Sequence, residues 1–333
     1  MYTWYARLCS IACVIALCVV VLGAWVRLTD AGLGCPDWPG CYGEMVLPGD
    51  ATAREEAQAA FPERKLDAGK AWREMIHRYL ATTLGMVIMG IAGLAWFNRR
   101  DPQQPVVLPL IVLATVVFQG LLGMWTVTLL LKPLIVMGHL LGGLTTTALL
   151  FWLVLDHHRR NSGVRTPRAV PFAVAGLAVL VCQIALGGWT SSNYAALACP
   201  DLPTCGGEWW PSDADFAEGF VMWRGLGVDY EFGVLDAPAR VAIHYTHRIG
   251  AGITTLVLGL IAFIYIRRDG PLRTAGTLVA LALATQVLIG LAIVWFGLPL
   301  WPAAAHNGVA ALLLLSMVNL NHAAARYDPV APA

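Results

Sequence analysis

Charged side chains are scarce in this sequence. Asp, Glu, Lys and Arg make up 13% of its 333 residues, whereas 58% are hydrophobic, and a soluble domain carries roughly 25% charged residues. The composition therefore excludes an ordinary water-soluble domain. The formal net charge of +1 gives no reason to expect a nucleic-acid partner. The sequence also lacks signatures for flavin, nicotinamide or iron–sulfur cofactors.

Long apolar runs are abundant instead. About 20 apolar residues suffice to cross a bilayer as a helix, and eight such runs occur. The first is longer than the core of a cleaved signal peptide and no clear cleavage site follows it, so we predict that it is retained. We predict an all-α membrane protein with eight transmembrane helices, near residues 5–27, 74–97, 105–128, 134–156, 169–190, 241–266, 273–295 and 302–322.

Basic residues in the short loops favour one side of the membrane. Such residues collect in the cytoplasm, and here they follow the second, fourth and sixth predicted spans. The short loops of the opposite side hold only Lys132. The pattern predicts a multi-pass protein of the inner (plasma) membrane with both termini in the cytoplasm. The clustered residues are Arg99, Arg100, Arg159, Arg160, Arg165, Arg168, Arg267, Arg268 and Arg273.

The chain contains one unit twice. Because each unit has an even number of helices, both cross the membrane in the same direction. We predict two four-helix bundles, residues 1–160 and 161–333, related by a pseudo-twofold axis along the membrane normal. The matched residues, at offsets of 164 to 170, are Gly23 and Gly187, Cys35 and Cys199, Cys41 and Cys205, His77 and His247, Gln119 and Gln286, and His139 and His306.

Four histidines occupy matched places in this repeat. His77, His139, His247 and His306 each lie one or two turns inside a span that begins on the outer side. A histidine in a membrane helix is costly and commonly serves a ligand or a proton, although for a lone one an interfacial or hydrogen-bonded role is the better interpretation. Four at repeated positions favour two pairs, each binding one iron from opposite faces of a haem.

The halves differ three residues before each of two histidines. Glu74 precedes His77, and His244 precedes His247. Residues three apart share a helix face, so each is predicted to point towards the pocket of its histidine. A buried carboxylate can take up or deliver a proton, which suits a chemical site in the first half. The alternative for Glu74 is a charge favoured by the helix dipole.

Arginines directly follow two of the histidines. Arg78 follows His77, and Arg248 follows His247. A guanidinium group in this place could pair with a haem propionate or extend to the membrane interface. A zinc site is less well supported, because the histidine pairs lack further ligands at short spacing.

Cysteine pairs lie in the two long loops predicted to be outside. Cys35 and Cys41 are separated by five residues, as are Cys199 and Cys205. An oxidising compartment permits disulfides, and a tight loop closes at little entropic cost. We favour structural disulfides; redox-active pairs are the alternative.

The sequence resembles the haem A synthase family over nearly all eight spans. This family oxidises the C8 methyl group of haem O to a formyl group by successive hydroxylations, giving haem A for terminal oxidases. The resemblance is carried by Gly23-Ala24-Trp25-Val26-Arg27-Leu28-Thr29, Cys35 and Cys41, Glu74-Met75-Ile76-His77-Arg78, His139-Leu140, His247-Arg248 and His306-Asn307.

The resemblance implies a role for each bundle. The C-terminal bundle would bind a haem b cofactor, and the N-terminal bundle would bind the substrate, haem O, with Glu74 in the reaction. Haem O synthase and an electron carrier would be partners, and an oligomer is compatible with this function. The implied ligands are His247, His306 and Arg248 for the cofactor, and His77, His139 and Arg78 for the substrate.

Two other functions fit the paired histidines. One is a di-haem b-type cytochrome that carries electrons between a quinone and an outer acceptor, and the other is a haem carrier. The difference between Glu74 and His244 counts mildly against both, because a symmetrical conduit has less reason to differentiate its halves.

Overall fold

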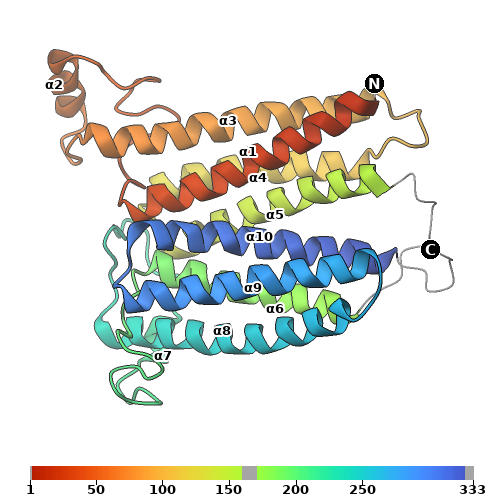
Figure 1. The fold of residues 1–333 in the computed structure, drawn as a ribbon. Helices are drawn as coiled ribbons and strands as arrows, with labels where there is room; N and C mark the ends of the chain where they lie inside the picture. Colours follow the sequence, from red (N-terminus) through yellow and green to blue (C-terminus); the bar gives the residue numbers. More distant parts are fainter. Residues whose placement is uncertain (1, 160–170, 327–333) are drawn as a thin grey trace.

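Eight long helices dominate the computed structural model, which describes residues 2–159 and 171–326 (Figure 1). Each is long and apolar enough to cross a membrane, which confirms the predicted all-α fold with eight spans. The long helices are α1 (Tyr2–Leu28), α3 (Ala68–Phe97), α4 (Val107–Thr128), α5 (Pro133–Arg159), α6 (Pro171–Ser192), α8 (Ala237–Ile266), α9 (Pro271–Trp295) and α10 (Leu300–Ala325).

Some predictions fall on residues outside this description. The structure does not describe the start of the fifth predicted span near residue 169 or the predicted boundary between residues 160 and 161. The same holds for three of the clustered arginines, Arg160, Arg165 and Arg168. Two short helices, α2 (Ala51–Ala60) and α7 (Phe216–Gly219), occur in the long loops. We call the end of the molecule that carries these loops the loop end.

Two of the long helices begin earlier than hydropathy indicates. α3 begins at Ala68 rather than near residue 74, because the Asp67 side chain accepts hydrogen bonds from backbone N–H groups of the first turn and caps the helix. α8 begins in the same way at Ala237, after Asp236. A first turn with one basic residue, Lys70 in α3 and Arg240 in α8, thus precedes each apolar run. His77 therefore lies between two and three turns from the start of α3, although it is only one or two turns inside the apolar run.

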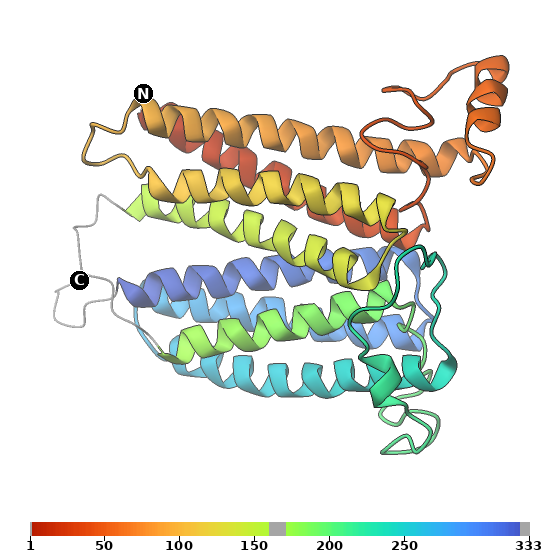
Figure 2. The same cartoon turned by 180° about the vertical axis from the view of Figure 1, so that it is seen from behind.

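The helices pack as two rings of four. α1 contacts α3, α3 contacts α4, α4 contacts α5, and α5 returns to α1. α6, α8, α9 and α10 close a second ring in the same order, and α1–α10, α5–α6 and α5–α10 contacts join the rings (Figures 1 and 2). If each helix is replaced by its counterpart in the other half, the same pairs of helices are in contact, as a twofold relation requires. The rotation axis and the division into two domains stay predictions.

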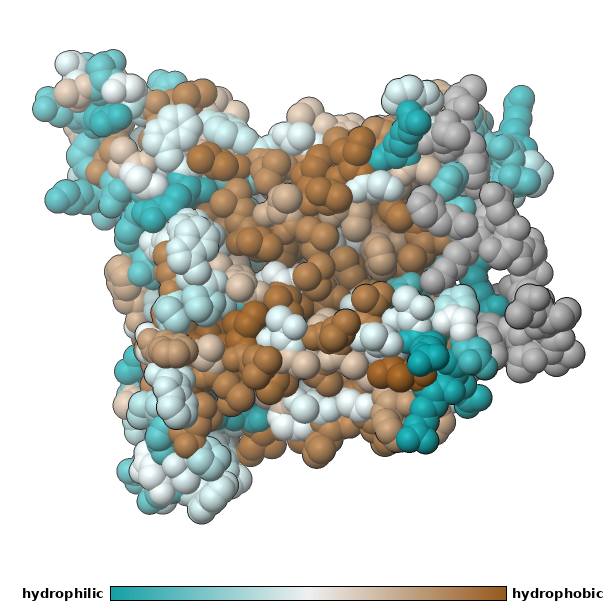
Figure 3. Space-filling model, in the orientation of Figure 1, coloured by the Kyte–Doolittle hydropathy of each residue, from teal (hydrophilic) through white to brown (hydrophobic). Residues whose placement is uncertain are grey.

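Apolar packing fills the interior of each ring, and the core of the second ring also includes Leu144 of α5. Ile88 and Leu150 belong to the core of the first ring, and Leu258 and Met317 belong to that of the second. Each of these side chains is fully buried, which contributes about 1.5–3 kcal/mol per residue. On the face shown in Figure 3, apolar side chains cover most of the helices and hydrophilic ones gather at their ends, as expected of a protein surrounded by lipid.

The loop between α6 and α8 reaches across to the first ring. Lys132, in the α4–α5 connection, is only 2% exposed, and its ammonium group donates to the carbonyl of Gly225 at 3.1 Å. The same group lies 3.6 Å from the ring centre of Trp223, a favourable cation–π distance. Arg64 forms a 2.6 Å ion pair with Asp229. The second long loop is thus fastened to both halves.

Candidate functional site

Each of the four histidines packs its ring against a glycine of a neighbouring helix. A side chain at any of these glycines would press on the ring, so the small residue lets two helices approach closely. The four contacts repeat between the halves. The distance from an added Cβ to the histidine Cε1 is 3.0 Å for Gly23 and His77, 3.4 Å for Gly123 and His139, 3.2 Å for Gly187 and His247, and 3.2 Å for Gly290 and His306.

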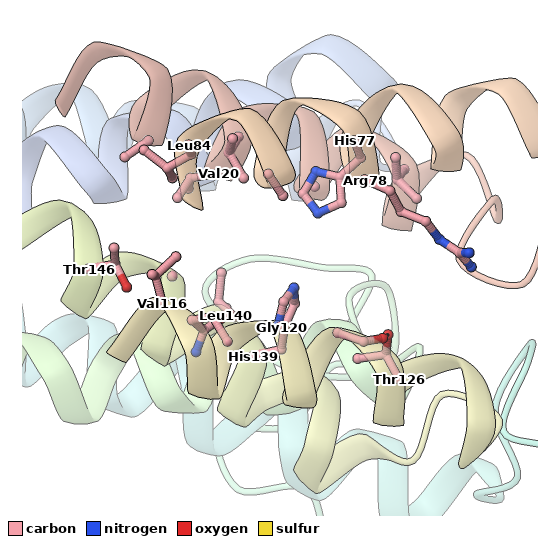
Figure 4. Close-up of a pocket in the computed structure, with 18 of the residues that line it drawn as sticks. Val20, His77, Arg78, Leu84, Val116, Gly120, Thr126, His139, Leu140 and Thr146 are labelled. Atoms are coloured by element: carbon pink, nitrogen blue, oxygen red, sulfur yellow. The ribbon is translucent and has the colours of Figure 1, made fainter. Parts of the chain in front are cut away.

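His77 on α3 and His139 on α5 face each other across a cavity of about 560 Å³ (Figure 4). Their ring centres are 6.5 Å apart and the ring planes are nearly perpendicular, at 86°. Nδ1 of each ring is buried and has no hydrogen-bond partner among the described residues. Metal–nitrogen bonds of about 2 Å on both sides would place two ring centres roughly 6–7 Å apart. The pair therefore fits a single iron.

The cavity extends to the lipid-facing surface between α3 and α4. Met86 of α3 and Val117 of α4 line it and are nevertheless 56% and 60% exposed. Gly85 and Gly120 line it too, and within the described part of the chain no atom would lie within 4 Å of a Cβ added to either. A molecule dissolved in the bilayer could enter the cavity sideways here.

Glu74 lies at the end of the cavity nearest the loop end and is only 4% exposed. Its Oε2 accepts the backbone N–H of Cys35 at 2.9 Å, and its Oε1 forms an ion pair with Arg78. The same guanidinium group donates to the carbonyls of Asp37 and Gly40. The structure therefore fastens the carboxylate to the first long loop by groups that also shape that loop.

The second half repeats this arrangement with an imidazole. His244 is buried, and its Nδ1 accepts the backbone N–H of Cys199 at 3.0 Å. Arg248 donates to the carbonyls of Cys199, Asp201 and Thr204 at 2.6 to 2.9 Å. The residue three before the histidine thus anchors a loop in both halves. Only in the first half is this residue a carboxylate. The pairing of Arg78 and Arg248 with haem propionates stays a prediction.

Both cysteine pairs form disulfides, Cys35 with Cys41 and Cys199 with Cys205. This confirms the predicted pairing. Through the hydrogen bonds just described, the disulfide loops pack against the N-terminal parts of α3 and α8, two to three turns from the start of each helix. Their position favours the structural role that we predicted from the short spacing.

Asp201 organises the second disulfide loop. The hydroxyl of Thr204 and the backbone N–H groups of Gly207 and Gly206 donate to its carboxylate. These hydrogen bonds lower the pKa of Asp201 from 3.8 to about 2. Because the folded-state pKa lies below the unfolded value, this contribution to stability is complete above about pH 4 and is lost as the pH falls towards 2. The loop should therefore not respond to pH in the physiological range.

Glutamines contact the second histidine pair. The amide nitrogen of Gln183, on α6, lies 3.1 Å from Nδ1 of His247. The amide nitrogen of Gln286, on α9, lies 3.1 Å from Nε2 of His306. Gln286 was visible in the sequence repeat, whereas Gln183 has no counterpart there and no local signal pointed to it.

The equivalent glutamine of the first half packs differently. Gln119 lies over Gly142, where a Cβ would come within 1.7 Å of the amide nitrogen. That nitrogen has no hydrogen-bond partner in residues 2–159 and 171–326. The two histidine pairs therefore share their glycine contacts but differ in their polar contacts.

Comparisons with known proteins add an independent line of evidence from the sequence. The model of the COX15-CtaA family, described as cytochrome oxidase assembly protein, matches residues 6–318. A haem A synthase of Shewanella oneidensis is 45% identical over 325 residues, with 96% of each chain covered. Haem A synthases of Rhizorhabdus wittichii and Halalkalibacterium halodurans are 28% and 25% identical; the alignments cover 93% and 94% of this chain and 90% and 93% of theirs.

Proposed function

Since the chain belongs to the COX15-CtaA family of cytochrome oxidase assembly proteins, we propose that it is a haem A synthase, an oxidoreductase that converts haem O to haem A. The observation that carries the proposal is the intramembrane cavity in which His77 and His139 face each other beside Glu74. The 45% identity to the Shewanella enzyme over nearly the full length supports it.

The reaction requires the active site to release protons. With water as the oxygen source, conversion of a methyl to a formyl group consumes one water overall and releases four electrons and four protons. Two hydroxylations give a geminal diol, which loses water to leave the aldehyde. A general base within the cavity would assist each proton transfer. Glu74 is the buried carboxylate that lines this cavity, and we assign it this role.

The remaining residues position the substrate and the base. His77 and His139 would bind the iron of haem O, so that the macrocycle stands in the cavity. Arg78 holds one oxygen of Glu74 and leaves the other on the Cys35 N–H group, which fixes the direction of the carboxylate. We assign the resident haem b to His247 and His306, with Arg248 beside it; when bound, it supplies one-electron transfer. An external carrier would then receive the electrons, and haem O synthase would supply the substrate.

The membrane orientation follows the same proposal. Clustered arginines favour a cytoplasmic location for the end opposite the loop end, so both termini would lie in the cytoplasm. Disulfides at the loop end support this orientation, because they persist in the oxidising compartment outside.

Pigment analysis of the purified protein tests the proposed function. We expect haem b together with haem O, haem A or a hydroxylated intermediate when the host supplies haem O. Mass analysis of the extracted haems identifies each of them. Two equivalents of haem b alone, with no conversion of added haem O, would favour the di-haem cytochrome instead.

The opening between α3 and α4 suits the isoprenoid tail of haem O. At positions matching Gly85 and Gly120, the second half carries Thr255 and Val287. These larger side chains are expected to narrow the corresponding gap beside the cofactor. The two glycines would thus serve a substrate that must enter and leave through the bilayer.

Replacing Gly85 by Val should hinder substrate entry without disturbing the fold. An added Cβ there meets no described atom within 4 Å, so the new side chain would project into the opening. We expect KM for haem O to rise by about tenfold, equivalent to about 1.4 kcal/mol of lost binding, with resident haem b unchanged. Gly93→Val is the matched control, since Gly93 also has open space but does not line the cavity. Equal effects of both variants would refute the entry route.

A further inference from the structure

We propose that Gln183 is a positioning residue that fixes the ring of His247 for iron ligation, and so distinguishes a haem that stays from a haem that is exchanged. The inference rests on the function proposed above, in which His247 and His306 bind the resident haem. It concerns a residue that has no counterpart in the first half of the repeat.

The Gln183 side chain occupies a site built for it between α6 and α8. Its amide nitrogen lies 3.1 Å from Nδ1 of His247 and 3.1 Å from the carbonyl oxygen of the same residue. Gly250 makes room for the amide, because a Cβ added there would come within 2.3 Å of the Gln183 Oε1. That oxygen is buried and has no hydrogen-bond partner within the described ranges.

If His247 binds iron through Nε2, the Gln183 amide can accept a hydrogen bond from Nδ1 of the same ring. A neutral imidazole that binds metal through Nε2 carries its proton on Nδ1, and an acceptor for that proton fixes the ring orientation and raises the basicity of the ligand. A half-turn of the Gln183 amide presents Oε1 to Nδ1, at the loss of the bond to the His247 carbonyl. The buried oxygen then gains the partner that it otherwise lacks.

The first half cannot supply this contact. Val19 stands at the position that matches Gln183, and Leu80 at the position that matches Gly250. Nδ1 of His77 accordingly has no partner among the residues that the structure describes. A haem bound by His77 would have a less basic and less firmly oriented ligand, which suits a substrate that must depart as product.

Haem retention and midpoint potential test the inference on the purified full-length protein. We expect haem b to transfer to excess apomyoglobin about 10–100-fold faster from Gln183→Val than from the wild type. The midpoint potential should rise, because a less basic ligand stabilises ferric iron less. Gln183→Glu keeps an acceptor and should retain haem as the wild type does. Gln119→Val replaces a glutamine of the first half, the counterpart of Gln286 rather than of Gln183, and should leave both readouts of haem b unchanged.

Wild-type retention and potential in Gln183→Val would overturn the inference. Should this variant fail to accumulate with haem, the reciprocal variant Val19→Gln with Leu80→Gly decides. It should release the haem of the first half more slowly, and an unchanged release rate would refute the assignment. Neither readout needs turnover, so an inactive protein that binds haem b would defeat the proposed function while leaving this test intact.

Discussion

Replacement of His247 or His306 by Ala is expected to abolish the absorption spectrum of the resident haem. The two side chains lie on α8 and α10, which belong to the same ring of helices. Each imidazole packs against its own glycine, Gly187 for His247 and Gly290 for His306. Removing one leaves the iron with a single protein ligand. The loss of affinity should exceed the roughly 100-fold that removal of an outer-shell partner causes.

Reduced-minus-oxidised spectra and pyridine-haemochrome content of the purified variants measure this effect. His157→Ala is a suitable control, because His157 lies on α5 at the end opposite His139. His306→Gly adds a second measurement: exogenous imidazole should occupy the vacated space and restore part of the spectrum. If both alanine variants kept the wild-type spectrum, the cofactor would have to lie elsewhere.

Glu74→Ala is expected to keep haem b and to lower the rate of haem A formation by at least about 100-fold, the usual contribution of a general acid or base. Alanine also removes the acceptor of the Cys35 N–H group, so this variant alone cannot separate chemistry from loop anchoring. The repeat supplies the variant that can. At the matching position, His244 accepts the N–H of Cys199 at 3.0 Å.

Glu74→His should therefore preserve the loop contact and remove the carboxylate. We expect it to be as inactive as Glu74→Ala, with the Cys35–Cys41 disulfide intact and haem b bound. Conversion of haem O under single-turnover conditions and thiol titration of the purified protein measure both properties. Substantial haem A formation by Glu74→His would assign Glu74 to loop anchoring and not to the reaction.

Sequence patterns could predict the spans and the proximity of His77 to His139, because the first follows from the length of apolar runs and the second from the sequence repeat. Hydrocarbon thickness sets the length of an apolar run. The repeat put His77 and His139 in the same half at similar depth, which predicted that they lie close together. The structure bears out that juxtaposition, at 6.5 Å between ring centres. The short spacing of the cysteines likewise predicted both disulfides.

Contacts that depend on loop conformation or on packing between helices were beyond such patterns. The early start of α3 follows from the Asp67 cap, a local signal that hydropathy does not register. The short helices α2 and α7 contain too few residues to produce a strong period. The hydrogen bonds of Arg78 to Asp37 and Gly40 require the folded disulfide loop. The contact of Gln183 with His247 joins residues on separate helices, and neither helix alone indicates it.

The helices α3, α5, α8 and α10 begin at the loop end (Figure 1), and each of the four histidines lies in the first half of its helix. With one haem in each half, electrons leaving the substrate would move sideways to the cofactor, parallel to the plane of the bilayer. Moving one elementary charge across the membrane changes its free energy by about 2.3 kcal/mol for each 100 mV of transmembrane potential. Transfer parallel to the membrane plane changes this free energy by almost nothing. Energising or collapsing the proton-motive force should consequently leave this internal electron transfer nearly unaffected.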